Sequence, residues 1–160
     1  MPEVRDYMSG NILTLVNKGF AALKYLKIPL VGSIAKNKLN KVLVKCDPQK
    51  VDAAYTIKLI EGAEKCAVGQ RVCNVLNNGA DHGESVFLDE LADGLVKTGK
   101  AVYVDKETAI KAITVDRKGP IILTRVSGKH MEICRSIAKN CIYWNSEKHG
   151  LKCIDKKARA

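Results

Sequence analysis

Two cysteine pairs with the same spacing constrain the fold of this 160-residue chain more than any other feature. Cys66 and Cys73 enclose six residues, and Cys134 and Cys141 enclose six residues as well. Two matched pairs suggest one site built from four thiolates. On a straight helix, residues seven apart are displaced by about 10 Å along the axis, which is too far to share a compact metal centre. If the pairs are ligands, the chain has to turn inside each of them.

Residues that tolerate unusual backbone conformations lie inside both pairs. Gly69 would permit a turn in the first pair, and Asn140 would permit one in the second. We therefore expect the chain to bend near Lys139 and Asn140. A straight helix from Cys134 to Cys141 would make shared ligation hard to sustain.

The type of donor limits the choice of metal. Thiolates are soft donors that select zinc, copper(I) or iron–sulfur clusters. Zinc sites usually bring their ligands in short loops of two to four residues, and the sequence contains no Cys-x-x-Cys. Longer loops suit a larger cluster, so we predict a [4Fe–4S] cluster bound by Cys66, Cys73, Cys134 and Cys141, with zinc as the alternative.

Two further cysteines leave the ligand set open. Cys153 could replace one of the four, and Cys46 is predicted to be a buried packing residue. Several cations near the predicted ligands could offset the negative charge of a cluster: Lys65, Arg71, Lys129, Arg135 and Lys139. The competing interpretation is that all six cysteines are small core residues, which is a common role of free cysteine.

The first 45 residues differ from the rest in charge. They contain eight Lys or Arg and two Asp or Glu, a balance of +6 within a net charge of +10 for the whole chain. Apolar residues recur at helical spacing over residues 9–27 and again from Ser33, which predicts two amphipathic helices. Such a pair can dock on a partner or on a membrane surface, or it can pack on the core of its own chain.

The remaining sequence predicts a small α+β body, mainly helical with a few short strands. We expect the basic helical arm to span residues 1–45 and the four-cysteine domain to span residues 46–160. The predicted elements are a helix beginning at Asp47-Pro48, a helix capped by Ser85, a strand over 101–104, a helix capped by Asp105 and a strand over 121–126.

Composition narrows the possible partners and the cellular compartment. No apolar run approaches the roughly 18 residues needed to span a bilayer. Glu3, Arg5 and Asp6 precede any apolar stretch, unlike in a secretory signal, so we expect a cytoplasmic protein whose cysteines are not paired in disulfides. The basic charge is compatible with nucleic acid, but the few aromatic residues are scattered, which makes nucleic acid a weaker candidate than protein docking.

Three segments carry a resemblance to a known family. Residues 84–93, 126–134 and 140–144 are similar to small four-cysteine iron–sulfur proteins of methanogenic archaea, among them the oxygen-responsive protein associated with the membrane-bound tetrahydromethanopterin S-methyltransferase complex. The resemblance covers roughly the carboxy-terminal two-thirds of the chain. It implies that Cys66, Cys73, Cys134 and Cys141 are cluster ligands and that the protein regulates a larger complex.

These observations together predict a non-catalytic protein. We expect a redox- or oxygen-responsive iron–sulfur protein that docks through residues 9–45 on a larger complex, in the cytoplasm or at the cytoplasmic face of the membrane. An electron-transfer or cluster-delivery protein with the same ligands is one alternative. A zinc-stabilised nucleic-acid-binding protein is the other.

Overall fold

A computed structural model describes residues 1–28, 31–77, 84–115 and 119–159 of the chain. Its helices are α1 (Val4–Ser9), α2 (Asn11–Tyr25), α3 (Val31–Lys45), α4 (Ala53–Gly62), α5 (Val72–Leu76), α6 (Asp89–Lys97), α7 (Lys106–Thr114) and α8 (Ile142–Lys148). Its strands are β1 (Gln49–Val51), β2 (Cys66–Gln70), β3 (Glu84–Leu88), β4 (Ala101–Val104), β5 (Ile121–Val126), β6 (Lys129–Arg135) and β7 (Asp155–Arg159). The chain therefore has the predicted α+β fold.

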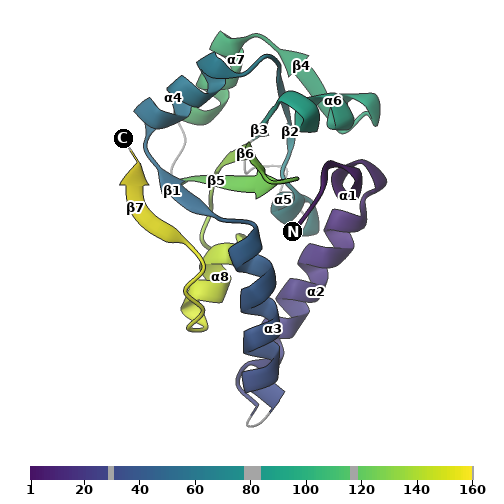
Figure 1. Cartoon of the computed structure of the whole chain (residues 1–160), viewed down its shortest axis with the longest axis vertical. Helices are drawn as coiled ribbons and strands as arrows, with labels where there is room; N and C mark the ends of the chain where they lie inside the picture. Colours follow the sequence, from purple (N-terminus) through teal and green to yellow (C-terminus); the bar gives the residue numbers. More distant parts are fainter. Residues whose placement is uncertain (29–30, 78–83, 116–118, 160) are drawn as a thin grey trace.

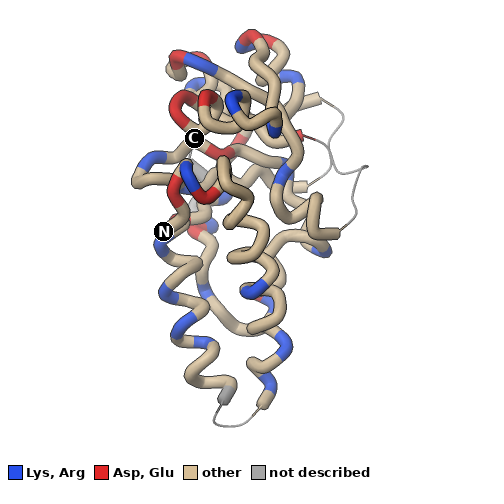
Figure 2. Tube along the Cα trace, turned by 90° about the vertical axis from the view of Figure 1, so that its right-hand side faces the viewer, with Lys and Arg blue, Asp and Glu red and all other residues tan. Residues whose placement is uncertain are grey.

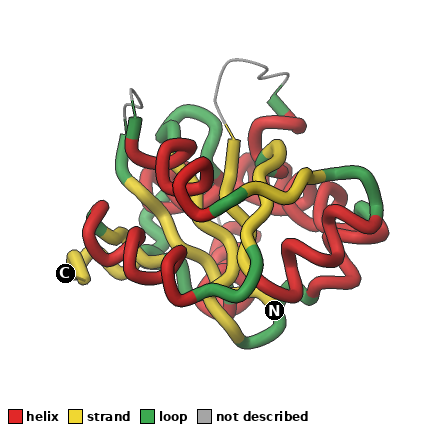
Figure 3. Tube along the Cα trace, turned by 90° about the horizontal axis from the view of Figure 1, so that it is seen from above, coloured by secondary structure: helices red, strands yellow, loops and turns green. Residues whose placement is uncertain are grey.

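One seven-stranded sheet forms the centre of the molecule, with more strands than the sequence led us to expect. The strand order is β4-β2-β3-β6-β5-β1-β7. Every neighbouring pair is antiparallel except β1 and β7, which are parallel. Seen from above, the strands run between helices on either side (Figure 3).

The alternation of side chains along the strands separates two buried regions. Along β6, Ile133 belongs to the larger hydrophobic cluster with Ile60 of α4 and Ile113 of α7. The next residue, Cys134, belongs to a second cluster with Leu43 of α3. Successive residues of a strand point to opposite faces of the sheet. Helices α4 and α7 therefore cover one face, and the hairpin formed by α2 and α3 lies over the other.

The α2–α3 hairpin extends from the sheet as a long projection (Figure 1). Lysines follow both of its helices (Figure 2). Residues 11–45 contain seven lysines and no acidic residue. Along its inner side, Leu23, Leu39 and Leu43 are buried in the same cluster as the carboxy-terminal cysteines. Packing on the core of its own chain, one of the open interpretations, thus holds for this part of the hairpin.

The first predicted helix, over residues 9–27, corresponds to α2, and Gly10 separates it from the shorter helix α1, which was not predicted from the sequence. This glycine adopts a φ of 83° between α1 and α2, a backbone conformation that glycine reaches at little cost. The short helix α1 lies against α6, where the Cα of Gly94 leaves room for Val4 and Met8. Within the described ranges, no helix combines the length and the apolar character needed to cross a membrane.

Two predicted helix starts are wrong. Asp47-Pro48 leads into strand β1, and the helix starts at Ala53 with the Asp52 side chain accepting a hydrogen bond of 2.7 Å from the Tyr55 backbone. Ser85 lies in β3 and does not cap a helix, because this segment pairs with β2 and β6. A capping residue marks a helix start only where tertiary strand pairing does not compete for the same segment.

Three other predicted elements are confirmed. Ala101–Val104 forms β4 and Ile121–Val126 forms β5. Asp105 caps α7 by accepting a hydrogen bond of 2.7 Å from the Thr108 backbone. In these segments the local capping pattern and the alternation of side chains agree with the tertiary packing.

We predict that Gly94→Ala weakens the packing of α1 on α6. The added Cβ would lie 2.8 Å from Val4 Cγ1 and 3.1 Å from Met8 Cγ, so the free energy of unfolding should fall by about 1 to 3 kcal/mol, as overpacking does elsewhere. Denaturant unfolding measures this change. Gly62→Ala is the matched control, because an added Cβ there meets nothing within 4 Å. Equal stability of the two variants would contradict the described packing.

Candidate functional site

Three of the four predicted ligands come together beside one buried arginine. Cys73 lies in α5, Cys134 in β6, and Cys141 precedes α8 as its N-cap residue. All three are buried, and the Arg71 Nη1 donates a hydrogen bond to the Cys134 sulfur. Cys141 and Cys73 also lie close enough to Arg71 to affect the pKa of its guanidinium. Three of the four predicted ligand residues therefore lie around the same guanidinium.

The second cysteine pair bends where the spacing predicts. Strand β6 ends at Arg135, and a turn over residues 138–140 leads into α8. The Asn140 backbone N–H donates a hydrogen bond of 2.9 Å to the Ile137 carbonyl, which closes this turn. The predicted bend near Asn140 is confirmed, and it brings both sulfurs of the pair toward Arg71.

The first pair does not turn at Gly69. This glycine lies inside β2, where an added Cβ would meet the backbone oxygen of Lys100 at 2.5 Å. The chain turns only at Arg71, after the strand has ended. Gly69 therefore serves close packing of the chain against β4, and the expectation of a turn at this residue is wrong.

Cys66 lies apart from the other three predicted ligands. Gly69 is opposite Ser85, and Ser85 is opposite Cys134, so these three residues share one face of the sheet. Cys66 is three positions along β2 from Gly69 and therefore points to the other face. Two strand spacings and three residues place it about 14 Å from the Cα of Cys134. The Cys66 sulfur faces the Ile60 carbonyl at 3.9 Å.

Cys46 and Cys153, the two cysteines outside the predicted ligand set, lie on the same side of the sheet as the three cysteines around Arg71. Cys46 and Cys153 belong to the same buried cluster as Cys73, Cys134 and Cys141. The Cys153 sulfur faces the Tyr143 carbonyl at 3.7 Å, and the Cys46 sulfur faces the Val42 carbonyl at 3.5 Å. Five of the six cysteines thus occupy one region, with Cys46 buried as predicted.

Burial favours the protonated form of three of these thiols. It raises the pKa of Cys134, although the Arg71 guanidinium opposes the shift. It raises the pKa of Cys73 to about 11 against the same opposing charge, and that of Cys153 to about 12. A neutral thiol is a poor nucleophile and a poor metal ligand, so either role would require loss of the proton.

A buried carboxylate compensates the charge of Arg71. Arg71 and Glu132 are both only 5% exposed, and the Arg71 Nε lies 4.0 Å from Glu132 Oε1. The other oxygen, Oε2, accepts hydrogen bonds of 2.8 Å from the Tyr7 hydroxyl and from the Thr124 hydroxyl. Burial by itself lowers the pKa of Arg71, and the negative charge of Glu132 opposes this shift while the thiols are protonated. The guanidinium therefore stays charged.

Three of the other predicted cations make contacts away from the thiols. Lys65 pairs with Asp93 and Lys129 with Glu90, each at 2.8 Å on the surface. Arg135 donates a hydrogen bond of 2.7 Å to the Ile113 carbonyl, on the α7 side of the sheet. Among the predicted cations with described contacts, Arg71 is the one that contacts a thiol.

Two residues of the candidate site were not predicted from the sequence. Glu132 and Cys134 are two residues apart along β6, so their side chains point to the same face of the sheet. A strand prediction for this segment would therefore have placed a carboxylate beside the thiol. Tyr7 reaches Glu132 from 125 positions away in the sequence, and no local pattern indicates such a contact.

The donors match a soft metal in chemical type but do not form a ready ligand shell. In the part of the chain that the structure describes, no three His, Cys, Asp or Glu side chains are arranged so that they could hold a metal ion. The guanidinium of Arg71 contacts Cys134, so shared ligation requires this side chain to withdraw. Cys66 would have to come from the opposite face, whereas Cys153 lies in the same buried cluster.

Comparison with known proteins adds no further assignment. No family model, curated protein or solved structure matches the chain.

We predict that Arg71 and Glu132 depend strongly on each other. Arg71→Met leaves a buried carboxylate without its counter-charge and should reduce the free energy of unfolding by about 3 to 5 kcal/mol. Arg71→Met combined with Glu132→Gln should be less destabilised than Arg71→Met alone, because the amide still accepts hydrogen bonds from Tyr7 and Thr124. Thermal and denaturant unfolding of the single and double variants measure this coupling.

The exposed pair formed by Lys65 and Asp93 is the matched control. Its side chains are 52% and 44% exposed, so Lys65→Met should change stability little. Additive effects of Arg71→Met and Glu132→Gln would contradict the close dependence between the two buried charges.

Proposed function

We propose that the chain is a non-catalytic, redox-responsive regulatory protein whose buried thiols hold an iron–sulfur cluster. The observation that carries the proposal is the convergence of Cys73, Cys134 and Cys141, from three separate elements, on one buried cation. A buried positive charge near thiolates favours an anionic cluster, as it favours other buried anions. Binding of a cluster would require these cysteines to lose their protons, and the positive charge of Arg71 beside them favours that loss.

The fourth donor in this proposal is Cys153. It shares the buried cluster with the three converging thiols, whereas Cys66 faces the other side of the sheet. A cluster, when bound, would supply a redox-sensitive link between α5, β6 and the carboxy-terminal segment. Since a shared metal centre contributes folding free energy, its loss on oxidation would loosen these elements from one another.

The partner surface in this proposal is the basic hairpin. Residues 11–45 carry seven lysines without an acidic residue, and several apolar side chains of α2 and α3 are exposed: Leu15, Tyr25, Ile34, Val42 and Val44. Cationic and apolar groups on one projecting element suit docking on an acidic protein face. We propose that the partner is a larger complex, in the cytoplasm or at the cytoplasmic face of the membrane, such as the methyltransferase complex that the resemblance implies.

Anaerobic purification with metal analysis tests the cluster. We expect brown protein with about four iron atoms per chain, as a [4Fe–4S] cluster requires. Cys73→Ser, Cys134→Ser, Cys141→Ser and Cys153→Ser should each lose most of the iron. Cys66→Ser is the matched control, because it removes a buried thiol on the opposite face and should keep the iron.

Two outcomes would contradict the proposal. One is a folded, colourless protein without iron after anaerobic purification. The other is iron that survives Cys153→Ser but is lost in Cys66→Ser, which would restore the ligand set predicted from spacing alone. Zinc in place of iron would point to the alternative metal.

A further inference from the structure

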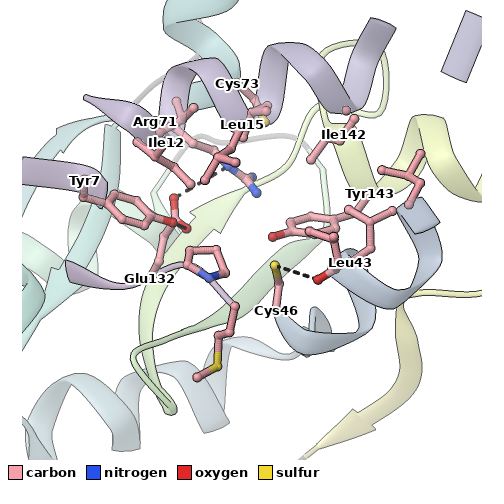
Figure 4. A pocket seen from close by; sticks show the side chains of 17 residues that line it. Tyr7, Ile12, Leu15, Leu43, Cys46, Arg71, Cys73, Glu132, Ile142 and Tyr143 are labelled. Atoms are coloured by element: carbon pink, nitrogen blue, oxygen red, sulfur yellow. Dashed lines mark hydrogen bonds and ion pairs between the residues drawn. The ribbon is translucent and has the colours of Figure 1, made fainter. Parts of the chain in front are cut away.

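A pocket of about 300 Å³ lies between the α2–α3 hairpin and the sheet, beside the buried charge pair (Figure 4). Three exposed apolar residues mark its mouth: Met1, Leu15 and Val42 are 47%, 49% and 52% exposed. Apolar side chains of α2, α3 and α8 line its walls. Exposed Leu15 and Val42 therefore belong to the rim of a cavity and not to a flat surface.

The floor of this pocket is polar and nearly buried. Arg71 and Glu132 line it together with Tyr7, and all three side chains point inward in Figure 4. Tyr7 and Thr124 both donate to Glu132 Oε2, while the nearest ion-pair partner of Oε1 is the Arg71 Nε at 4.0 Å. That distance is too long for a hydrogen bond, so a gap separates a charged donor from a charged acceptor.

The charges on the floor limit what the pocket can accept. The guanidinium and the carboxylate cancel, and the buried thiols nearby are neutral. A ligand carboxylate would place a second negative charge next to Glu132, and a ligand ammonium would place a second positive charge next to Arg71. Either arrangement buries an uncompensated charge, which is costly.

We propose that this pocket binds an apolar molecule of about ten non-hydrogen atoms that ends in one uncharged hydroxyl group. A hydroxyl can accept a hydrogen bond from Arg71 and donate one to Glu132 Oε1, which would bridge the gap on the floor. The size follows from the cavity volume, since a water-sized group occupies about 30 Å³ in the liquid. The exposed apolar rim would cover the chain of the ligand.

Titration calorimetry with three eight-carbon probes tests the proposal on the reduced, full-length protein. The probes are octan-1-ol, octanoate and octylammonium, which share the apolar chain and differ in the charge of the head. Octan-1-ol should bind saturably at one site, at least tenfold more tightly than either charged probe. Binding of these probes does not require a metal. A failure of octan-1-ol to bind and an absence of iron in the purified protein are therefore independent findings.

Two variants test the contributions of the rim and of the floor to ligand binding, and a third variant is a control. Leu15→Glu places a charge at the mouth and should weaken octan-1-ol binding at least tenfold. Val102→Glu is its matched control, because Val102 is 62% exposed on β4 and does not line the pocket. Glu132→Gln leaves the positive charge of Arg71 on the floor and should reverse the preference toward octanoate.

Three results would overturn the proposal. They are the absence of saturable binding of octan-1-ol, wild-type binding of a charged probe as tight as that of octan-1-ol, and equal binding by the Leu15→Glu and Val102→Glu variants. Should Glu132→Gln fail to fold, the comparison of the two surface variants and the three-probe series still decide the matter.

Discussion

The buried pair of Arg71 and Glu132 holds together parts of the chain that are distant in sequence. Arg71 stands between β2 and α5, and Glu132 lies in β6. Through Tyr7 and Thr124 the carboxylate also contacts α1 and β5. Burying two charges is expensive unless their hydrogen bonds and charges are matched, so the segments that carry Arg71, Glu132, Tyr7 and Thr124 are held in one relative arrangement.

The guanidinium of Arg71 takes part in two features. It contacts the cysteines around it, and it lines the pocket between the α2–α3 hairpin and the sheet. Its Nη1 contacts Cys134, while its Nε faces Glu132 at the pocket floor. Withdrawal of Arg71 from Cys134, which metal binding would require, would also alter the floor of the pocket. A ligand in the pocket and a metal at the thiols would therefore be coupled through one side chain, since each favours a particular position of it.

The sequence predicts local features of this fold better than long-range ones. The cap at Asp105, the strands at 101–104 and 121–126 and the bend before Cys141 follow from neighbouring residues, and all are confirmed. The failures at Asp47 and Ser85 come from strand pairing with distant segments, which overrides a local helix-start signal. The position of Cys66 could not be inferred from the equal spacing of the cysteine pairs. The face of the sheet to which its side chain points depends on the register of β2 with β3 and of β3 with β6.

Cys73, Cys134 and Cys141 lie together around Arg71, and Cys66 lies apart from them. Cadmium-113 NMR tests this grouping most directly. Cadmium is a soft ion whose resonance reports how many sulfurs bind it. One low-field resonance should appear in the wild-type protein and stay unchanged in Cys66→Ser, but move or vanish in Cys73→Ser, Cys134→Ser and Cys141→Ser. A resonance that depends on Cys66 as much as on the other three would contradict the grouping.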